Sequence, residues 1–304
     1  MGITRSVALA ALLVAVPLRA HAGDKAAWNA AKTNLSKDTT VLIGLDLTQL
    51  TKSTLFTMAF PMILSQQPDV KEGLELLKTT CQLDPLKVVT NIVVGTDDAQ
   101  KHGAMFVALD GVDQPRIVSC LEAVAKAKGK DSKVVVTTDG KITELSVGDK
   151  KVYLTWIGTN VLALPLDFAN KADLAAWTTK GLAKSKVGKA VTKVNTGNAI
   201  WAVSAVAKDL DDKTRMKLGY GSVAMANATI TADLHVRLGS AADAKAAAEK
   251  AQKELTTLSQ SPGLAANLQK LLAGISVTSI TDEVQVKGAM PESEVLQLIG
   301  ALIQ

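Results

Sequence analysis

Few residues of this chain carry the chemistry that catalysis or metal binding requires. His21 falls in the N-terminal apolar segment, so the folded protein keeps only His102 and His235. They lie far apart in the sequence, and neither has neighbours at metal-ligand spacing. The chain also lacks a Gly-x-Ser-x-Gly motif and suggests no Cys–His pairing. We therefore predict no catalytic residue, no metal ligand and no cofactor.

Two glycine-containing stretches resemble phosphate-binding loops only in part. Residues 219–224, Gly-Tyr-Gly-Ser-Val-Ala, match a dinucleotide fingerprint, but an alternating β-type run follows where that site needs a helix. Gly181 and Gly188-Lys189 are too widely spaced for a nucleotide loop, and Ala190 replaces the hydroxyl residue that would hold Mg²⁺. We interpret residues 181–196 as a Lys- and Gly-rich linker; contact of its lysines with an anionic surface is the alternative.

The sequence contains two cysteines, Cys81 and Cys120. Cys81 ends one helical pattern, and Cys120 lies on the apolar face of the next clear helix. Because exported proteins meet an oxidising compartment, we predict a disulfide between them, with two separate buried thiols as the alternative. Closing the loop of about 40 residues between them would stabilise the fold by roughly 4 kcal/mol in the chain-entropy model.

The segment 55–64 is rich in methionine and phenylalanine and has almost no polar face. Such a helix is either buried in the core or forms the wall of an apolar binding site, because methionine adapts to irregular ligands. Pro61 is expected to break or kink it. The predicted wall consists of Leu55, Phe56, Met58, Phe60, Met62 and Ile63.

The first 22 residues have the form of a secretory signal peptide. A basic start precedes an apolar run from Ser6 to Leu18, and Ala20-His-Ala22 is typical of a cleavage site. The apolar run is shorter than the roughly 20 residues that span a bilayer. We predict export to the periplasm or the outside of the cell, a mature chain that starts at Gly23, and no transmembrane segment in that chain.

The charge pattern argues against nucleic-acid binding. Without Arg5 and Arg19, 32 of the 34 basic residues remain against 29 acidic ones, a net charge of +3. Only three of these basic residues are arginines, the side chain that best recognises phosphates and base edges. Aromatic residues, at 3% of the chain, are too scarce for base stacking.

The elements expected along the chain predict an α+β fold. Residues 133–166 contain four short β-rich runs separated by tight turns, which is typical of an antiparallel β-meander. A strand, helix and strand order recurs in the second part of the chain. We predict two related halves, residues 23–180 and 197–304, each an antiparallel sheet with helices packed on one face.

This arrangement resembles uncharacterised exported bacterial proteins built from duplicated α+β units. Three features carry the resemblance: the strand 41–47, Val-Leu-Ile-Gly-Leu-Asp-Leu; the segment 81–87, Cys-Gln-Leu-Asp-Pro-Leu-Lys; and the cysteine of the next helix. The resemblance covers mostly the first half and implies no activity.

These features favour an exported, soluble, non-catalytic protein that binds an apolar small molecule or another cell-envelope protein. The alternative is a hydrolase whose polar residues assemble only in three dimensions. A binder should present apolar binding surface without perturbed titratable groups, whereas an enzyme should present a cleft where such groups cluster.

Overall fold

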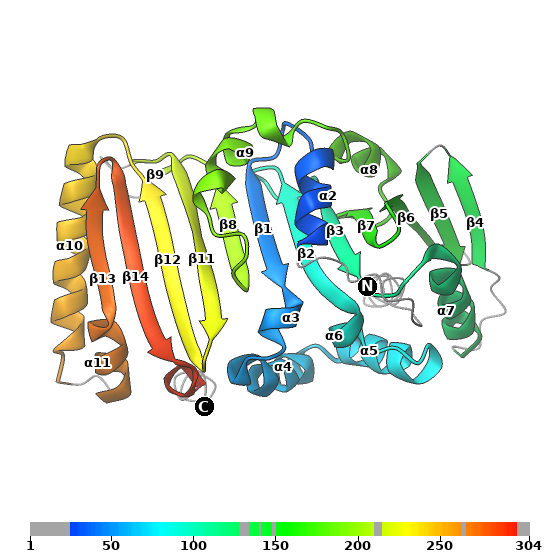
Figure 1. Cartoon of the computed structure of the whole chain (residues 1–304), viewed down its shortest axis with the longest axis horizontal. Helices are drawn as coiled ribbons and strands as arrows, with labels where there is room; N and C mark the ends of the chain where they lie inside the picture. The colour runs from blue at the N-terminus through cyan, green and yellow to red at the C-terminus, as the bar shows by residue number, and fades with distance from the viewer. Residues whose placement is uncertain are drawn as a thin grey trace. The chain divides into compact units, whose positions relative to one another are not determined.

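The computed structural model of the chain describes residues 25–127, 134–139, 141–147, 150–209, 215–262 and 266–296. The chain divides into two compact units (Figure 1). Among the described residues, unit 1 holds 25–39, 44–48 and those within 60–185, and unit 2 holds 40–43, 49–59 and those within 186–296. Both combine helices with antiparallel strands, which confirms the α+β class. The predicted signal peptide lies outside the described residues, and the relation between the two halves stays a prediction.

Three elements contribute residues to both units: β1 (Val41–Asp46), α3 (Leu47–Leu50) and α4 (Thr54–Gln66). The strands of unit 1 pair antiparallel in the order β2-β3-β7-β6-β5-β4. The other elements of unit 1 are α2 (Ala26–Asn34), α5 (Pro68–Thr80), α6 (Pro85–Val88), β2 (Val89–Thr96), β3 (Gly103–Leu109), α7 (Gln114–Ala127), β4 (Val134–Asp139), β5 (Ile142–Val147), β6 (Lys150–Ile157), β7 (Val161–Pro165), α8 (Lys171–Trp177) and η1 (Leu182–Lys184).

The predicted meander is present as β4 to β7, each strand pairing with the next. Alternation places Thr143 and Leu145 on the buried side of β5. The turn between β6 and β7 uses Gly158 at φ +64°, a conformation that costs glycine little. The local pattern therefore determined both the strands and their antiparallel order.

Helices cover both faces of the central strands in unit 1. Phe106 and Val107 point to opposite faces of β3, yet their exposed fractions are 0% and 1%. On the face of Phe106, Leu35 at the end of α2 packs so closely on Gly95 that a Cβ there would lie 2.7 Å from its side chain. On the face of Val107, Leu77 of α5 and Ile117 and Leu121 of α7 belong to one core cluster with residues of the strands. The strand residues include Leu109, Leu154, Leu162 and Leu164.

Unit 2 contains an antiparallel sheet in the order β8-β11-β12-β14-β13. Asn227 and Ala228 both have positive φ, which is the geometry of a tight hairpin turn between β11 and β12. The elements are α9 (Lys186–Ala190), η2 (Val191–Lys193), β8 (Ile200–Ser204), the small pair β9 (Lys208–Asp209) and β10 (Arg215–Met216), β11 (Leu218–Ala226), β12 (Thr229–Arg237), α10 (Ala241–Ser259), α11 (Ala266–Ala273), β13 (Ile275–Ile280) and β14 (Glu283–Pro291).

Helix α10 covers one face of this sheet. The Ser240 hydroxyl oxygen accepts a hydrogen bond from the Asp243 N–H at 3.1 Å, which confirms the capping pattern visible in the sequence. Ala244 and Ala248 pack against Val277 and Val284. Leu258, at the end of the same apolar stripe, is instead 50% exposed. A helix of 19 residues is about 28 Å long, whereas the six residues of β13 span about 20 Å, so its last turns reach beyond that strand.

The interval predicted to be a linker, residues 181–196, contains η1, α9 and η2. Leu182, Val187 and Val191 are buried, and the division between the units falls between Ser185 and Lys186. The structure thus packs much of this lysine-rich interval, and residues 186–196 belong to unit 2.

Candidate functional site

The six predicted wall residues all lie on α4, and no residue of this helix is buried. Met58, Met62 and Ile63 have exposed fractions of 55%, 37% and 57%. Leu55, Phe56 and Phe60 are half-buried. The helix is therefore not a core helix, and it presents a ridge of apolar side chains to solvent.

Hydrogen bonds fix the start of α4, although the apolar side chains on its outer face are exposed to solvent. Glu292, which is buried, accepts a hydrogen bond from the Leu55 N–H at 3.1 Å, and the Ser53 hydroxyl oxygen accepts one from the Phe56 N–H at 3.3 Å. Two of the N–H groups that a helix leaves unpaired at its start are thereby satisfied.

The break predicted at Pro61 is wrong, because α4 runs through this residue as one helix; a kink there stays a prediction. Proline cannot donate to the carbonyl of Thr57, four residues earlier. Both residues are exposed, so water can reach that carbonyl. The cost of an interior proline is therefore reduced on this side of the helix.

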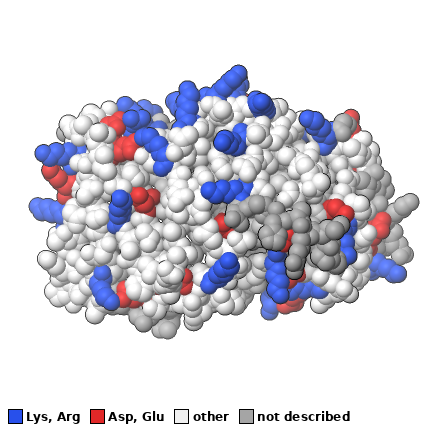
Figure 2. Space-filling view, in the orientation of Figure 1, with Lys and Arg blue, Asp and Glu red and all other residues white. Residues whose placement is uncertain are grey.

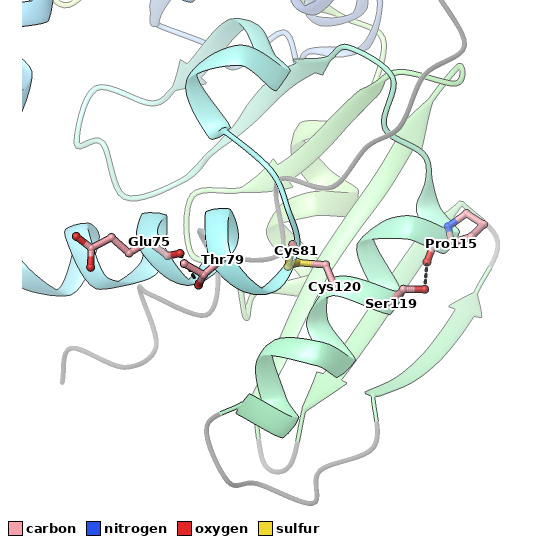
Figure 3. The surroundings of a disulfide bond; sticks show 6 residues. All are labelled: Glu75, Thr79, Cys81, Pro115, Ser119 and Cys120. Atoms are coloured by element: carbon pink, nitrogen blue, oxygen red, sulfur yellow. Dashed lines mark hydrogen bonds between the residues drawn. A yellow bond between two sulfur atoms is a disulfide. The ribbon is translucent and has the colours of Figure 1, made fainter.

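Cys81 and Cys120 lie at disulfide distance, with Cα atoms 5.2 Å apart (Figure 3). The pair joins the end of α5 to the middle of α7, and both residues are in the core cluster of unit 1. This geometry agrees with the predicted bond. Labelling of free thiols tests whether the bond forms in the mature protein.

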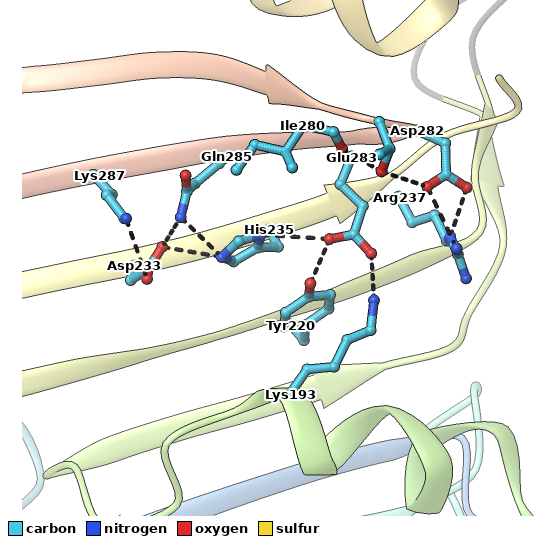
Figure 4. Close-up of polar contacts among 11 residues, drawn as sticks. Lys193, Tyr220, Asp233, His235, Arg237, Ile280, Asp282, Glu283, Gln285 and Lys287 are labelled. Atoms are coloured by element: carbon cyan, nitrogen blue, oxygen red, sulfur yellow. Dashed lines mark hydrogen bonds and ion pairs between the residues drawn. The ribbon is translucent and has the colours of Figure 1, made fainter. Parts of the chain in front are cut away.

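A cluster of polar side chains occupies the face of the unit 2 sheet that α10 leaves uncovered (Figure 4). Glu283 and Gln285 alternate along β14 with Val284, which packs toward α10. The Glu283 carboxylate accepts hydrogen bonds from the Tyr220 hydroxyl and from Lys193 Nζ, the latter at 2.7 Å. Only 9% of its side chain is exposed.

The cluster continues across the neighbouring strands. The His235 ring stacks on the Tyr220 ring with centroids 4.7 Å apart, and its Nδ1 lies 3.5 Å from Glu283 Oε2. Gln285 Nε2 donates to Asp233 Oδ1 at 2.8 Å. The register of the sheet places Tyr220, His235 and Gln285 side by side on three adjacent strands.

Tyr220 and Glu283 in the cluster, and Asp282 beside it, have pKa values displaced from their ordinary ranges. Burial and the hydrogen bond to Glu283 raise the pKa of Tyr220. Burial opposes the charge of Glu283, but the hydrogen bonds from Lys193 and Tyr220 outweigh it and lower the pKa of this carboxyl. The hydrogen bond from Arg237, whose Nε lies 2.7 Å from Asp282 Oδ2, lowers the pKa of Asp282.

This arrangement meets one criterion of the hydrolase alternative, since shifted groups cluster beside a groove. The directions of the shifts argue against proton transfer, because a general acid or base works best with a pKa near neutrality. Tyr220 is held protonated and Glu283 is held ionised. In the sequence, polar residues occupy every second position of 233–237 and of 283–287. This alternation places them on one face of each strand, but it does not show that the two strands are neighbours.

The glycine-containing stretch 219–224 and His102 were also considered from the sequence, and packing or hydrogen bonding accounts for both. Residues 219–224 lie within β11, where a Cβ on Gly221 would come 2.5 Å from the Asp233 carbonyl oxygen, so this glycine permits close strand packing. His102 lies just before β3 and its Nδ1 is 3.0 Å from the Asp173 carboxylate. That contact raises the pKa of His102.

Among the described residues, no group of three or more His, Cys, Asp and Glu side chains is arranged to hold a metal ion. Within the same part of the chain, no helix is both long and apolar enough to span a bilayer.

No family model and no curated protein matches the chain. Three crystal forms of TP0453, a Treponema envelope protein, are similar to it in structure, with TM-scores of 0.49, 0.48 and 0.47 and sequence identities of 8%, 8% and 9%. Each alignment covers 90% of this chain and 96–98% of the other. A likeness at this level carries no argument about function.

Proposed function

We propose that this is an exported, non-catalytic binding protein whose α4 helix docks on an apolar surface of another cell-envelope protein. The observation that carries the proposal is the exposure of Met58, Met62 and Ile63 on a helix without a buried residue. Large apolar side chains grouped on a surface favour association, since covering them removes apolar area from water.

The shape of this surface favours a protein over a small molecule. A small apolar ligand is usually enclosed in a concave site, whereas the exposed side chains of α4 form a ridge. A ridge of this kind suits recognition in which a helix fits the groove of a partner. Methionine helps, because its unbranched side chain adapts to the contours of that groove. An apolar small molecule remains the second occupant to be tested.

Export is supported by the predicted signal peptide and by the cysteine pair at disulfide distance. Both features fit an oxidising compartment outside the cytoplasm. N-terminal sequencing of the protein from its own cells should give a mature chain that begins at Gly23, and retention of the first 22 residues would contradict export by cleavage.

The proposal can be tested by native mass spectrometry of the protein purified from its own envelope. The test variant is Met58→Gln/Met62→Gln. Its control is Leu258→Gln/Ile280→Gln, which changes two apolar residues of similar exposure, 50% and 48%, on unit 2 elements other than α4. We expect the wild type and the control to carry a partner of protein mass and the α4 variant to lose it.

The other outcomes are equally informative. An adduct of a few hundred daltons that the α4 variant loses would assign the surface to an apolar small molecule in place of a protein. A wild type without any adduct, or an adduct that the α4 variant retains, would contradict the role of α4. Thermal unfolding of both variants controls for loss of fold.

A further inference from the structure

A groove in unit 2 has a strongly basic lining. Its volume is about 540 Å³, within the roughly 300–1,000 Å³ of small-molecule sites, and its lining includes five basic residues and one acidic residue. All of them belong to unit 2. The charged residues of the lining are Lys186, Lys189, Lys193, Lys217, Arg237 and Asp282.

The fold brings these cations together from three places in the sequence. Lys186, Lys189 and Lys193 are spaced by three and four residues through α9 and η2, so a helical backbone presents them on one side. Lys217 precedes β11 and Arg237 ends β12, and the Lys217 N–H donates to the Arg237 carbonyl at 2.9 Å. Figure 2 shows basic side chains gathered at the upper edge of this face, where Figure 1 draws α9.

Two of the five cations already have a carboxylate partner. Arg237 pairs with Asp282, and Lys193 pairs with the ionised Glu283. Lys217 Nζ donates only to the Gly239 carbonyl, at 3.3 Å, which leaves its charge without a counter-ion in the described part of the chain. The side-chain ammonium groups of Lys186 and Lys189 form no hydrogen bond or ion pair with the residues that the structure describes. Three positive charges of the groove therefore have no carboxylate partner among the residues that the structure describes.

We infer that this groove binds a phosphate group carried by a small organic molecule. Several ammonium groups around one space suit an anion that has multiple charges and several acceptor oxygens, and lysine is a common phosphate ligand. A cleft lined by one sign of charge also concentrates such anions. Ala190, Ala205 and Leu218 line the same groove and give the carbon part of the ligand an apolar surface. This inference does not depend on the proposed role of α4.

The test measures binding of pyrophosphate by isothermal titration calorimetry and binding to phosphatidylglycerol vesicles by co-flotation, with phosphatidylcholine vesicles as the reference. The test variant is Lys186→Gln/Lys189→Gln. Its control, Lys250→Gln/Lys253→Gln, removes the same charge from exposed residues at the same spacing on α10. Hydrogen bonds to charged groups are strong enough that the test variant should bind at least about tenfold more weakly, while the control stays within about twofold of the wild type.

The two arms distinguish the source of the phosphate. Binding of pyrophosphate that only the test variant loses supports a freely diffusing phosphate compound, and binding to phosphatidylglycerol vesicles alone, lost in the same way, supports a lipid headgroup. Absence of both kinds of binding in the wild type overturns the inference. So does equal weakening in the control, since the effect would then come from net charge and not from the groove.

Discussion

The sheets of the two units differ in what their faces carry. In unit 1, apolar side chains occupy both faces of the central strands, and the cysteine pair joins two of the covering helices. In unit 2, α10 covers an apolar face, while the other face carries the Glu283 cluster beside the basic groove. The comparison indicates that the sheet of unit 1 is packed with apolar side chains on both faces, whereas one face of the unit 2 sheet carries charged and polar side chains that pair with one another.

The largest effect is expected in the core of unit 1. Phe106→Ala should lower the free energy of unfolding by about 3–5 kcal/mol, because the ring is fully buried and its removal leaves a cavity. Leu234→Ala on β12 in unit 2 is the matched change at an exposed apolar position and should cost less than about 1 kcal/mol. Urea unfolding followed by circular dichroism measures both. Equal losses would show that the two positions do not differ in packing as their exposed fractions predict.

Removal of the cysteine pair should act on unit 1 alone. Cys81→Ala/Cys120→Ala frees a loop with a sequence separation of 39, whose closure contributes up to about 4 kcal/mol in the chain-entropy model. Hydrogen exchange read by mass spectrometry should show faster exchange in α5 and α7 and little change in β11 to β14. Quantitative labelling of free thiols in the unreduced, unfolded wild type would argue against the bond itself.

In unit 2, Glu283→Gln should lower the free energy of unfolding by about 1–3 kcal/mol, because it leaves the Lys193 charge without its partner in a partly buried site. The pKa of Glu283 is lowered by folding, so its carboxylate stabilises the fold fully above its ordinary value of 4.5. That contribution is lost as the pH falls through the lowered pKa. The variant should therefore lose less stability than the wild type when acidified from neutral pH to below that range.

Tyr220→Phe is the control for this effect, because it removes the hydroxyl and keeps the ring that stacks on His235. It should retain most of the acid dependence of the wild type, since the Lys193 contact with Glu283 remains. Identical acid profiles for the wild type and Glu283→Gln would show that the cluster contributes no charge-dependent stability.

The smallest effects are expected on α4. Met58→Ala and Met62→Ala should each cost less than about 1 kcal/mol, because neither side chain is buried and their exposed fractions are 55% and 37%. Leu77→Ala, at a fully buried position of α5, should cost about 2–5 kcal/mol. Losses of several kcal/mol in both methionine variants would show that α4 packs as a core helix and would contradict its proposed role in binding.

Local patterns in the sequence were enough for much of the fold. The meander 133–166 was predicted from turn residues and alternation, and Ser240 with the alanine spacing that follows it is typical of the capped helix seen there. Both signals depend on residues a few positions apart, which the backbone geometry of strands and helices places on known faces. The same patterns did not reveal that helices cover both faces of the unit 1 sheet, because this depends on how distant segments pack.

The sequence by itself determined the α+β class, the apolar character of α4 and the positions of the two cysteines. Only the tertiary structure decided that α4 faces solvent, and only it brought Lys193, Tyr220 and Glu283 into contact across separations of up to 90 residues. Periodicity says which side of an element is apolar, but exposure depends on what packs against that side. A charged cluster depends further on strand register, which places one residue of each strand beside a particular residue of the next.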